Sequence, residues 1–333
     1  MLAAPAVALG QAAVQVPVRI DSHEVFRPIS TTTQGQNKTG SLRSLKFDAY
    51  GRRFDITLEP NPRFAAAAAA IHVDGPALSL YQGKLKNVTG SWVRMSARAQ
   101  SISGLIWDGQ ELYVVDSASI LGAAAGAAPT ETIIFRLSDA EFAPGVPFCD
   151  SAPLPAGKNA YDSLVRELKN SPVIMQAVGA SLRLEVSALG DAPFRNRYSS
   201  DQQAREAILT RLNNVDGIFT SQLGVEIQVP TMNINDSIAS QLSATTDSGK
   251  LIDELGRLRD RTSVLKARGL THLFTGRDLD DNTVGIAYTG GICSRRYSAG
   301  LTQVGPSPTI DSLITAHEIG HNFGAPHDGD PDN

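Results

Sequence analysis

The first part of the chain alternates apolar and polar residues, as β-strands with one buried face do. Residues 41–59 carry this pattern on both sides of a turn at Tyr50-Gly51, and their apolar side chains are Leu45, Phe47, Phe54, Ile56 and Leu58. Alternation around a turn that contains glycine predicts a β-hairpin.

Similar runs predict further strands at 78–82, 91–95 and 101–106. Asp108-Gly109 precedes residues 111–116 and predicts a tight hairpin turn, because both central residues of such a turn must tolerate positive φ. We therefore expect residues 20–142 to form a β-rich domain.

The alternation stops at residue 143. Residues 143–160 contain four prolines and two glycines, which predicts a linker, and a helix is expected at about 160–179. Residues 143–180 are thus interpreted as a linker followed by a helix.

From residue 181 onward, short apolar strands alternate with helical patterns. A strand at 182–186 precedes a helix whose capping box is Ser200 with Gln203 and whose apolar stripe is Ile208, Leu212, Val215 and Phe219. Strands follow at 225–229 (closed by Pro230), at 273–276, at 285–288 and at 300–303, with a helix through Leu251, Leu255 and Leu258 and another from near Asp311. This order predicts an α/β fold with a mostly parallel twisted sheet that is covered by helices.

Composition and charge restrict the classes of function. The chain has 333 residues, enough for two domains, and a formal net charge of −4 from 30 basic and 34 acidic residues. Nothing in this balance favours a nucleic-acid partner. No apolar run approaches the roughly 20 residues that a membrane span requires.

The most specific chemical signal is His317-Glu318-Ile319-Gly320-His321-Asn322-Phe323-Gly324-Ala325-Pro326-His327-Asp328. On a helix, His317 and His321 point from one face, so both imidazoles can bind one tetrahedral zinc ion. Glu318 stands beside them as a candidate general base, Gly324 can end the helix in a left-handed conformation, and His327 can return as a third ligand. The alternative is three histidines with purely structural contacts. However, three of the six histidines in the chain lie in this short run.

HEIGHNFGAPHD resembles the metzincin signature HExxHxxGxxH, and the Asp after the third His resembles the adamalysin (reprolysin) branch. The resemblance implies an adamalysin-like catalytic domain over 181–333, in which His317, His321 and His327 bind Zn²⁺, Glu318 is the general base and Asp328 is a structural carboxylate. It further implies hydrolysis of internal peptide bonds in a protein or peptide substrate, which lies along an antiparallel edge strand at 285–288.

The runs SLKFDAYGRRFDITLEPN and GKLKNVTGSWVRMS resemble adamalysin propeptide sequence, and the alternative is an unrelated β module. The propeptide interpretation implies a β-rich prodomain and a latent zymogen. Cys149 is then a candidate cysteine switch whose thiolate would occupy the open zinc position, although Asp150 replaces the usual following glycine. A disulfide with Cys293 and two unrelated thiols remain as alternatives.

Two other groups of residues receive structural interpretations. His272 lies in an apolar strand and is expected in the core or at its rim, not as a ligand. Asp278, Asp280 and Asp281 fit a solvated loop better than a calcium site.

The two ends of the chain carry further expectations. Residues 1–13 resemble part of a secretory signal peptide, which favours a secreted or extracellular protein over a flexible tail. Metzincins also have a methionine turn downstream of the zinc motif, whereas Met1, Met95, Met175 and Met232 all lie upstream. We therefore expect the C-terminal subdomain to be missing from this chain, and the alternative function is a non-catalytic zinc-binding protein or an inactive fragment.

Overall fold

The computed structural model describes residues 18–34, 41–71, 78–98, 101–121, 128, 130–142, 150–152 and 182–327. The predictions for residues 1–13, for the helix at 160–179, for Cys149 and for Asp328 lie outside the described residues.

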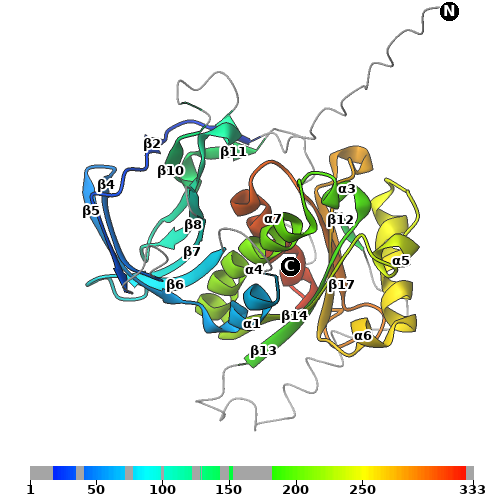
Figure 1. The fold of residues 1–333 in the computed structure, drawn as a ribbon. Helices are drawn as coiled ribbons and strands as arrows, with labels where there is room; N and C mark the ends of the chain where they lie inside the picture. Colours follow the sequence, from blue (N-terminus) through cyan, green and yellow to red (C-terminus); the bar gives the residue numbers. More distant parts are fainter. Residues whose placement is uncertain are drawn as a thin grey trace, which may run out of the picture.

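An antiparallel sheet of nine strands occupies the amino-terminal part of the chain (Figure 1). Its order is β2-β10-β9-β8-β7-β6-β5-β4-β3. The strands are β2 (Glu24–Val25), β3 (Ser30–Gln34), β4 (Ser41–Ala49), β5 (Arg52–Pro60), β6 (Ser79–Leu85), β7 (Trp92–Arg98), β8 (Ser101–Trp107), β9 (Leu112–Ser117) and β10 (Thr132–Arg136). A two-stranded ribbon of β1 (Val18–Ile20) and β11 (Ala140–Phe142), helix α1 (Pro62–Ile71) and two 3-10 turns, η1 (Ala118–Leu121) and η2 (Leu137–Asp139), complete this part. We call residues 18–142 the β domain.

The predicted hairpin at 41–59 is confirmed. Strands β4 and β5 pair with Phe47 opposite Phe54, and Tyr50 and Gly51 both have positive φ, 53° and 69°. Two consecutive residues with positive φ give the turn the twist that antiparallel strands prefer.

The predicted turn at Asp108-Gly109 is wrong in length. Trp107 pairs with Leu112, so four residues connect β8 to β9, and of the predicted pair Gly109 has positive φ while Asp108 does not. The Asp108 carboxylate accepts hydrogen bonds from the backbone N–H groups of Gln110 and Glu111. This local hydrogen bonding stabilises the longer loop.

A mixed six-stranded sheet with helices on both faces forms the carboxyl-terminal part. Its order is β12-β16-β17-β15-β13-β14, and among the described strands only β16 and β17 pair in antiparallel fashion. The strands are β12 (Asp150–Ala152), β13 (Leu182–Gly190), β14 (Val225–Ile234), β15 (Leu270–Thr275), β16 (Gly285–Tyr288) and β17 (Ala299–Gln303). The helices are α3 (Ala192–Arg195), α4 (Asp201–Leu223), α5 (Ser248–Arg261), α6 (Ser263–Lys266) and α7 (Pro308–Asn322), with 3-10 turns η4 (Ala239–Gln241) and η5 (Asp280–Asn282). We call residues 182–327 the second domain.

The expected mostly parallel sheet is therefore present, but Pro230 does not close β14, which continues to Ile234. Strand β14 lies at the edge of the sheet, and its pairing with β13 shifts register between Glu185 and Ser187. An edge position with a bulge tolerates a proline that lacks an N–H donor.

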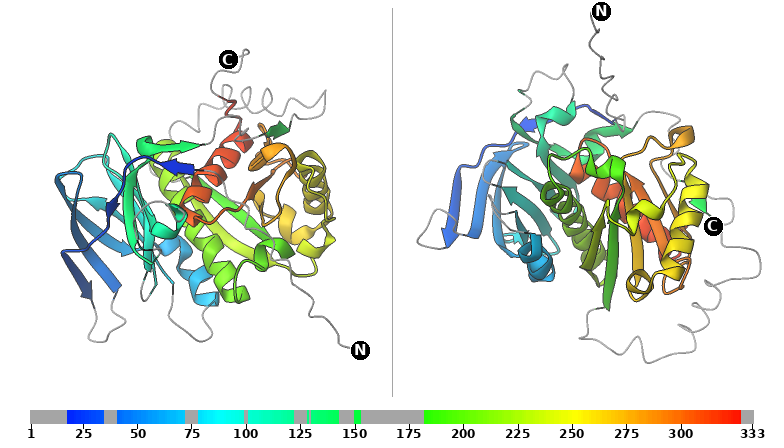
Figure 2. Two further views of the ribbon diagram at one scale, coloured as in Figure 1. Left: turned by 90° about the horizontal axis from the view of Figure 1, so that it is seen from above. Right: turned by 45° about the vertical axis from the view of Figure 1, so that its right-hand side comes forward.

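Helix α4 lies between the two sheets (Figures 1 and 2). Its predicted apolar stripe packs on the second sheet, as Leu212 and Phe219 show. The opposite face is polar, yet Asn213, Asn214 and Asp216 are completely buried. The β domain covers this face, which a pattern of apolar and polar positions would assign to solvent.

Within the described residues, no helix is both long enough and apolar enough to cross a membrane.

Candidate functional site

Helix α7 carries the candidate metal ligands and begins at Pro308, three residues before the expected start at Asp311. Ser307 is its N-cap, since the Ser307 Oγ accepts a hydrogen bond from the Ile310 N–H. Proline at the first helical position needs no N–H partner. The pair Ser307-Pro308 could therefore have predicted the start of this helix from the sequence.

The three predicted histidines converge on one point. The Nε2 atom of His321 lies 3.0 Å from His317 Nε2 and 3.1 Å from His327 Nε2. Helix α7 ends at Asn322, and Gly324 turns the chain back with a φ of 99°, as expected. This turn places His327, which follows the helix, against the pair on the helix.

These side chains fit a zinc ion. Three nitrogen ligands at ~2.0–2.1 Å from a tetrahedral ion stand about 3.3 Å from one another, close to the observed separations. The His321 Nδ1–H donates a hydrogen bond of 2.6 Å to the Ala325 carbonyl oxygen, which leaves Nε2 as the nitrogen with a lone pair for the metal. Among the described residues, these histidines are the one group of three or more His, Cys, Asp or Glu side chains close enough to share an ion.

Glu318 is completely buried next to the first histidine. Its carboxylate lies directly against Gly285 of β16: a Cβ atom added to Gly285 would stand 2.4 Å from Glu318 Oε1. Our sequence reasoning did not give Gly285 this role. A glycine inside a strand is the signal for such a close approach.

The carboxyl end of α7 is tied to the sheet by Asn322. Its side-chain amide donates to the carbonyl oxygens of Tyr288 and Ala299, at 3.0 and 2.9 Å. The N–H groups of Gly290 and Ile292 donate to the last helical carbonyls, those of His321 and Asn322. The helix end is therefore held against β16, and Asn322, which sequence reasoning also missed, fixes the distance between the histidines and the edge strand.

The amino-terminal half of α7 is held by a buried ion pair. The Arg211 guanidinium on α4 donates to the Asp311 carboxylate at 2.6 and 3.2 Å, and both side chains are almost fully inaccessible. A second Asp311 oxygen accepts from the Gly305 N–H.

His272 is a core residue, as predicted. It is completely buried on β15, its Nε2 atom lies 2.9 Å from Thr302 Oγ1, and burial lowers its pKa to about 3. The imidazole is thus neutral over most of the pH range.

The remaining candidates are placed as follows. Asp278, Asp280 and Asp281 are exposed, as a solvated loop requires. Cys293 is an exposed free thiol. Cys149 and Asp328 lie outside the described residues.

Strand β16 was expected at the edge of the sheet, but the edge is formed by β12, which the sequence did not predict. Strand β12 pairs with it in parallel, with Ser151 opposite Ala287 and Ala152 opposite Tyr288. The described residues just after Cys149 therefore cover the strand along which a substrate was expected. They lie at the edge of the sheet, next to β16, which α7 contacts.

Comparisons with known proteins agree with this geometry. Residues 182–333 match the Reprolysin_5 model, described as metallo-peptidase family M12. Snake venom metalloproteinase H5 from Deinagkistrodon acutus is 32% identical over 143 residues. The aligned part makes up 41% of this chain and 34% of the relative, so the chain spans about a third of that protein's length.

The match begins where β13 begins and includes α7 and all three histidines. Over residues 182–333 the chain is therefore similar to the reprolysin-type metallopeptidases of family M12.

Proposed function

We propose that the second domain is a zinc-dependent endopeptidase that hydrolyses internal bonds of proteins or peptides. The observation that carries this proposal is the convergence of three imidazole Nε2 atoms beside the buried Glu318 carboxylate. A purely structural zinc site has no need of a carboxylate at that position.

His317, His321 and His327 would hold the zinc ion. Zinc in such a site polarises a carbonyl and makes water a nucleophile near neutral pH. Glu318 would take the proton of the attacking water and later transfer it to the leaving amine. Burial of Glu318 against Gly285 limits the positions that its carboxylate can adopt.

Once β12 is displaced, strand β16 would bind the substrate as an added strand, because its edge then offers unpaired backbone N–H and C=O groups. The pairing of β12 with β16 supports synthesis as a latent precursor, since the segment after Cys149 occupies that edge. Cys149 remains the candidate thiolate that would complete the latent state, and Asp328 the candidate carboxylate behind the ligands.

Export from the cell is part of the proposal. It rests on the signal-like residues 1–13 and on the relation to a venom protein.

Glu318→Gln tests the proposal. Glutamine has nearly the same shape but cannot accept the proton, so cleavage of a mixed peptide library should fall by about 10²–10⁴-fold while one zinc per chain is retained. Zinc is measured by elemental analysis, and the matched His321→Ala chain should lose both zinc and cleavage. Unchanged cleavage in Glu318→Gln would contradict the role of Glu318. Wild-type chain that binds no zinc would overturn the site itself. Zinc without cleavage, even after removal of residues 1–180, would favour the non-catalytic alternative.

A further inference from the structure

The β domain and the second domain meet through charged groups that are shielded from water. Asp216 on α4 is completely buried, and its Oδ2 atom accepts hydrogen bonds from Nε and Nη2 of Arg94 on β7 at 3.0 and 2.8 Å. Arg63 at the start of α1 adds a third contact, of 3.2 Å. Two arginines from one domain thus enclose one carboxylate of the other.

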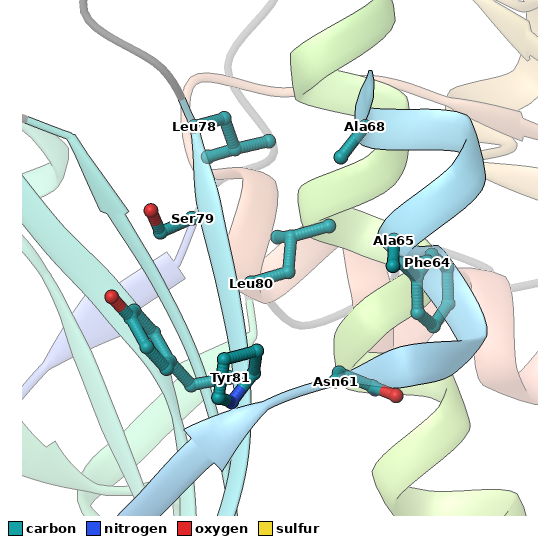
Figure 3. Close-up of a pocket in the computed structure, with 9 residues that line it drawn as sticks. Asn61, Phe64, Ala65, Ala68, Leu78, Ser79, Leu80 and Tyr81 are labelled. Atoms are coloured by element: carbon teal, nitrogen blue, oxygen red, sulfur yellow. The ribbon is translucent and has the colours of Figure 1, made fainter. Parts of the chain in front are cut away.

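Neutral and charged contacts surround this centre. Asn61 donates to the Asn213 side chain at 2.9 Å, and Asn213 donates in turn to the backbone carbonyls of Tyr81 and Met95. Figure 3 shows Asn61 at the start of α1, beside a mainly apolar pocket of about 160 Å³ that residues of α1 and β6 line. The ion pairs Arg63–Glu226 and Arg98–Glu206, at 2.9 and 2.6 Å, also join the two domains.

An apolar cluster continues the contact toward the amino-terminal half of α7. Ile310 and Leu313 on α7 and Ile218 on α4 pack on the face of the β domain sheet that is turned toward the second domain. Their partners there are Leu105, Val114, Ile133 and Phe135, all of which are fully buried.

The backbones of the two domains also approach each other closely. A Cβ atom added to Gly217 would stand 2.7 Å from both Arg94 Cγ and Trp92 Cζ3, so α4 lies directly on β7. The N-cap residue of α7, Ser307, donates its hydroxyl hydrogen to the buried Asp116 carboxylate on β9. We call this surface of the second domain the α4–α7 face; its residues are Glu206, Asn213, Asp216, Gly217, Ile218, Ser307, Ile310 and Leu313.

These features are those of a permanent interface. Transient interfaces are wetter and leave their charges near solvent, whereas here an apolar core adjoins a fully buried carboxylate and its nearly buried arginine. Apolar burial supplies the affinity, and the desolvated pairs fix the orientation and slow the dissociation, because a partly separated state would leave Asp216 without its arginines.

We propose that the β domain binds the α4–α7 face as a separable subunit, with Asp216 as its anchor, and stays bound after the chain is cut between β12 and β13. The proposal concerns attachment alone and does not depend on catalysis. A cut in this connection would therefore leave the two parts of the chain together.

The test uses the full chain with a site-specific protease sequence inserted between residues 153 and 181. Glu318→Gln in the same chain prevents self-cleavage. After the cut, size-exclusion chromatography and dilution measure whether the two fragments remain associated and how fast they separate. The expected result is a stable complex of both fragments.

Arg94→Met keeps the length and packing of the side chain but removes its charge, so dissociation should become about 100-fold faster or more. The matched control is Arg53→Met on β5, since Arg53 is half exposed and pairs with Asp48 of its own domain. The control should change dissociation by less than about twofold.

Separation of the wild-type fragments after the cut would overturn the proposal, as would Arg94→Met fragments that stay together as firmly as wild type. If Arg94→Met yields no soluble chain, a double-mutant cycle of Arg63→Met and Glu226→Gln replaces it. Coupling between these two positions in the dissociation constant supports the interface, and complete additivity contradicts it. Because association is scored without substrate, this result is independent of whether the chain proves to be a peptidase.

Discussion

At the scale of single residues, the candidate site depends on the histidines and equally on the lack of a side chain at Gly285. Glu318 occupies the space that a side chain on β16 would fill. In the proposed mechanism this contact sets the direction from which the carboxylate can reach a water molecule. Small displacements of a general base reduce rates strongly, because proton transfer requires hydrogen-bond geometry.

Gly285→Ala should therefore lower cleavage by about 10²-fold while zinc binding is unchanged, because the new methyl group would displace Glu318 and leave the histidines in place. The measurement is kcat/KM on a cleaved peptide together with zinc stoichiometry. Gly249→Ala is the matched control: Gly249 is exposed near the start of α5, and its Cβ would meet no atom closer than 3.5 Å. Equal activity of the two variants would exclude a positioning role for Gly285.

At the scale of secondary structure, α7 is held at both ends by elements distant in sequence. Arg211 of α4 binds its amino-terminal half, and Asn322 joins its carboxyl end to β16 and β17. Strand β16 is thereby held in a fixed position relative to the histidines. Strand β12 lies on the other side of β16, where an extended peptide would otherwise pair.

Replacing Asp150, Ser151 and Ala152 by prolines should increase cleavage of the peptide library at least about tenfold, because proline has no N–H donor and cannot maintain the pairing with β16. Initial rates are compared with those of wild-type chain at equal zinc content. The same replacement in the Glu318→Gln background is the control and should remain inactive. Rates equal to wild type would mean that β12 does not keep the chain latent.

At the scale of the whole molecule, α4 belongs to the cores of both domains. Its apolar stripe packs on the second sheet, and its buried polar face packs on the β domain. We therefore expect the domains to unfold together. Both tryptophans of the chain, Trp92 and Trp107, lie on β7 and β8 of the β domain and report on that part alone.

Acid should destabilise both domains through His272, although this residue lies in the second. Its folded pKa of about 3 is below the unfolded value of ~6.5. Its contribution to the free energy of unfolding is therefore complete above pH 6.5 and is lost as the pH falls toward 3. The loss reaches at most ~1.4 kcal/mol per pH unit.

Urea unfolding at pH 6.5 and 4.5, above most carboxyl titrations, measures this slope. The His272→Gln chain should have the smaller slope, and the difference between the chains removes the effect of other groups, zinc ligands included. Tryptophan fluorescence and far-ultraviolet circular dichroism should report the same midpoint. Separate midpoints would show that the domains unfold independently, and equal slopes would show that His272 does not titrate as expected.

The sequence alone determined those features that arise from local geometry. A four-residue spacing on a helix places His317 and His321 together, and a glycine at the helix end brings His327 to them. Alternation around Tyr50-Gly51 likewise determined the first hairpin, because strand period and turn conformation are local properties. The convergence of the three histidines and the residue range of β16 could therefore be predicted.

Only the tertiary structure decided which surfaces are covered. Asp216 and Asn213 are polar and lie outside the predicted apolar stripe of α4, yet the β domain buries them with complementary arginine and amide groups. Gly285 against Glu318, and β12 on β16, are likewise contacts between segments far apart in the chain. A one-dimensional pattern records whether a residue tolerates water, but not which distant group replaces the water, because that choice is made when the whole chain packs.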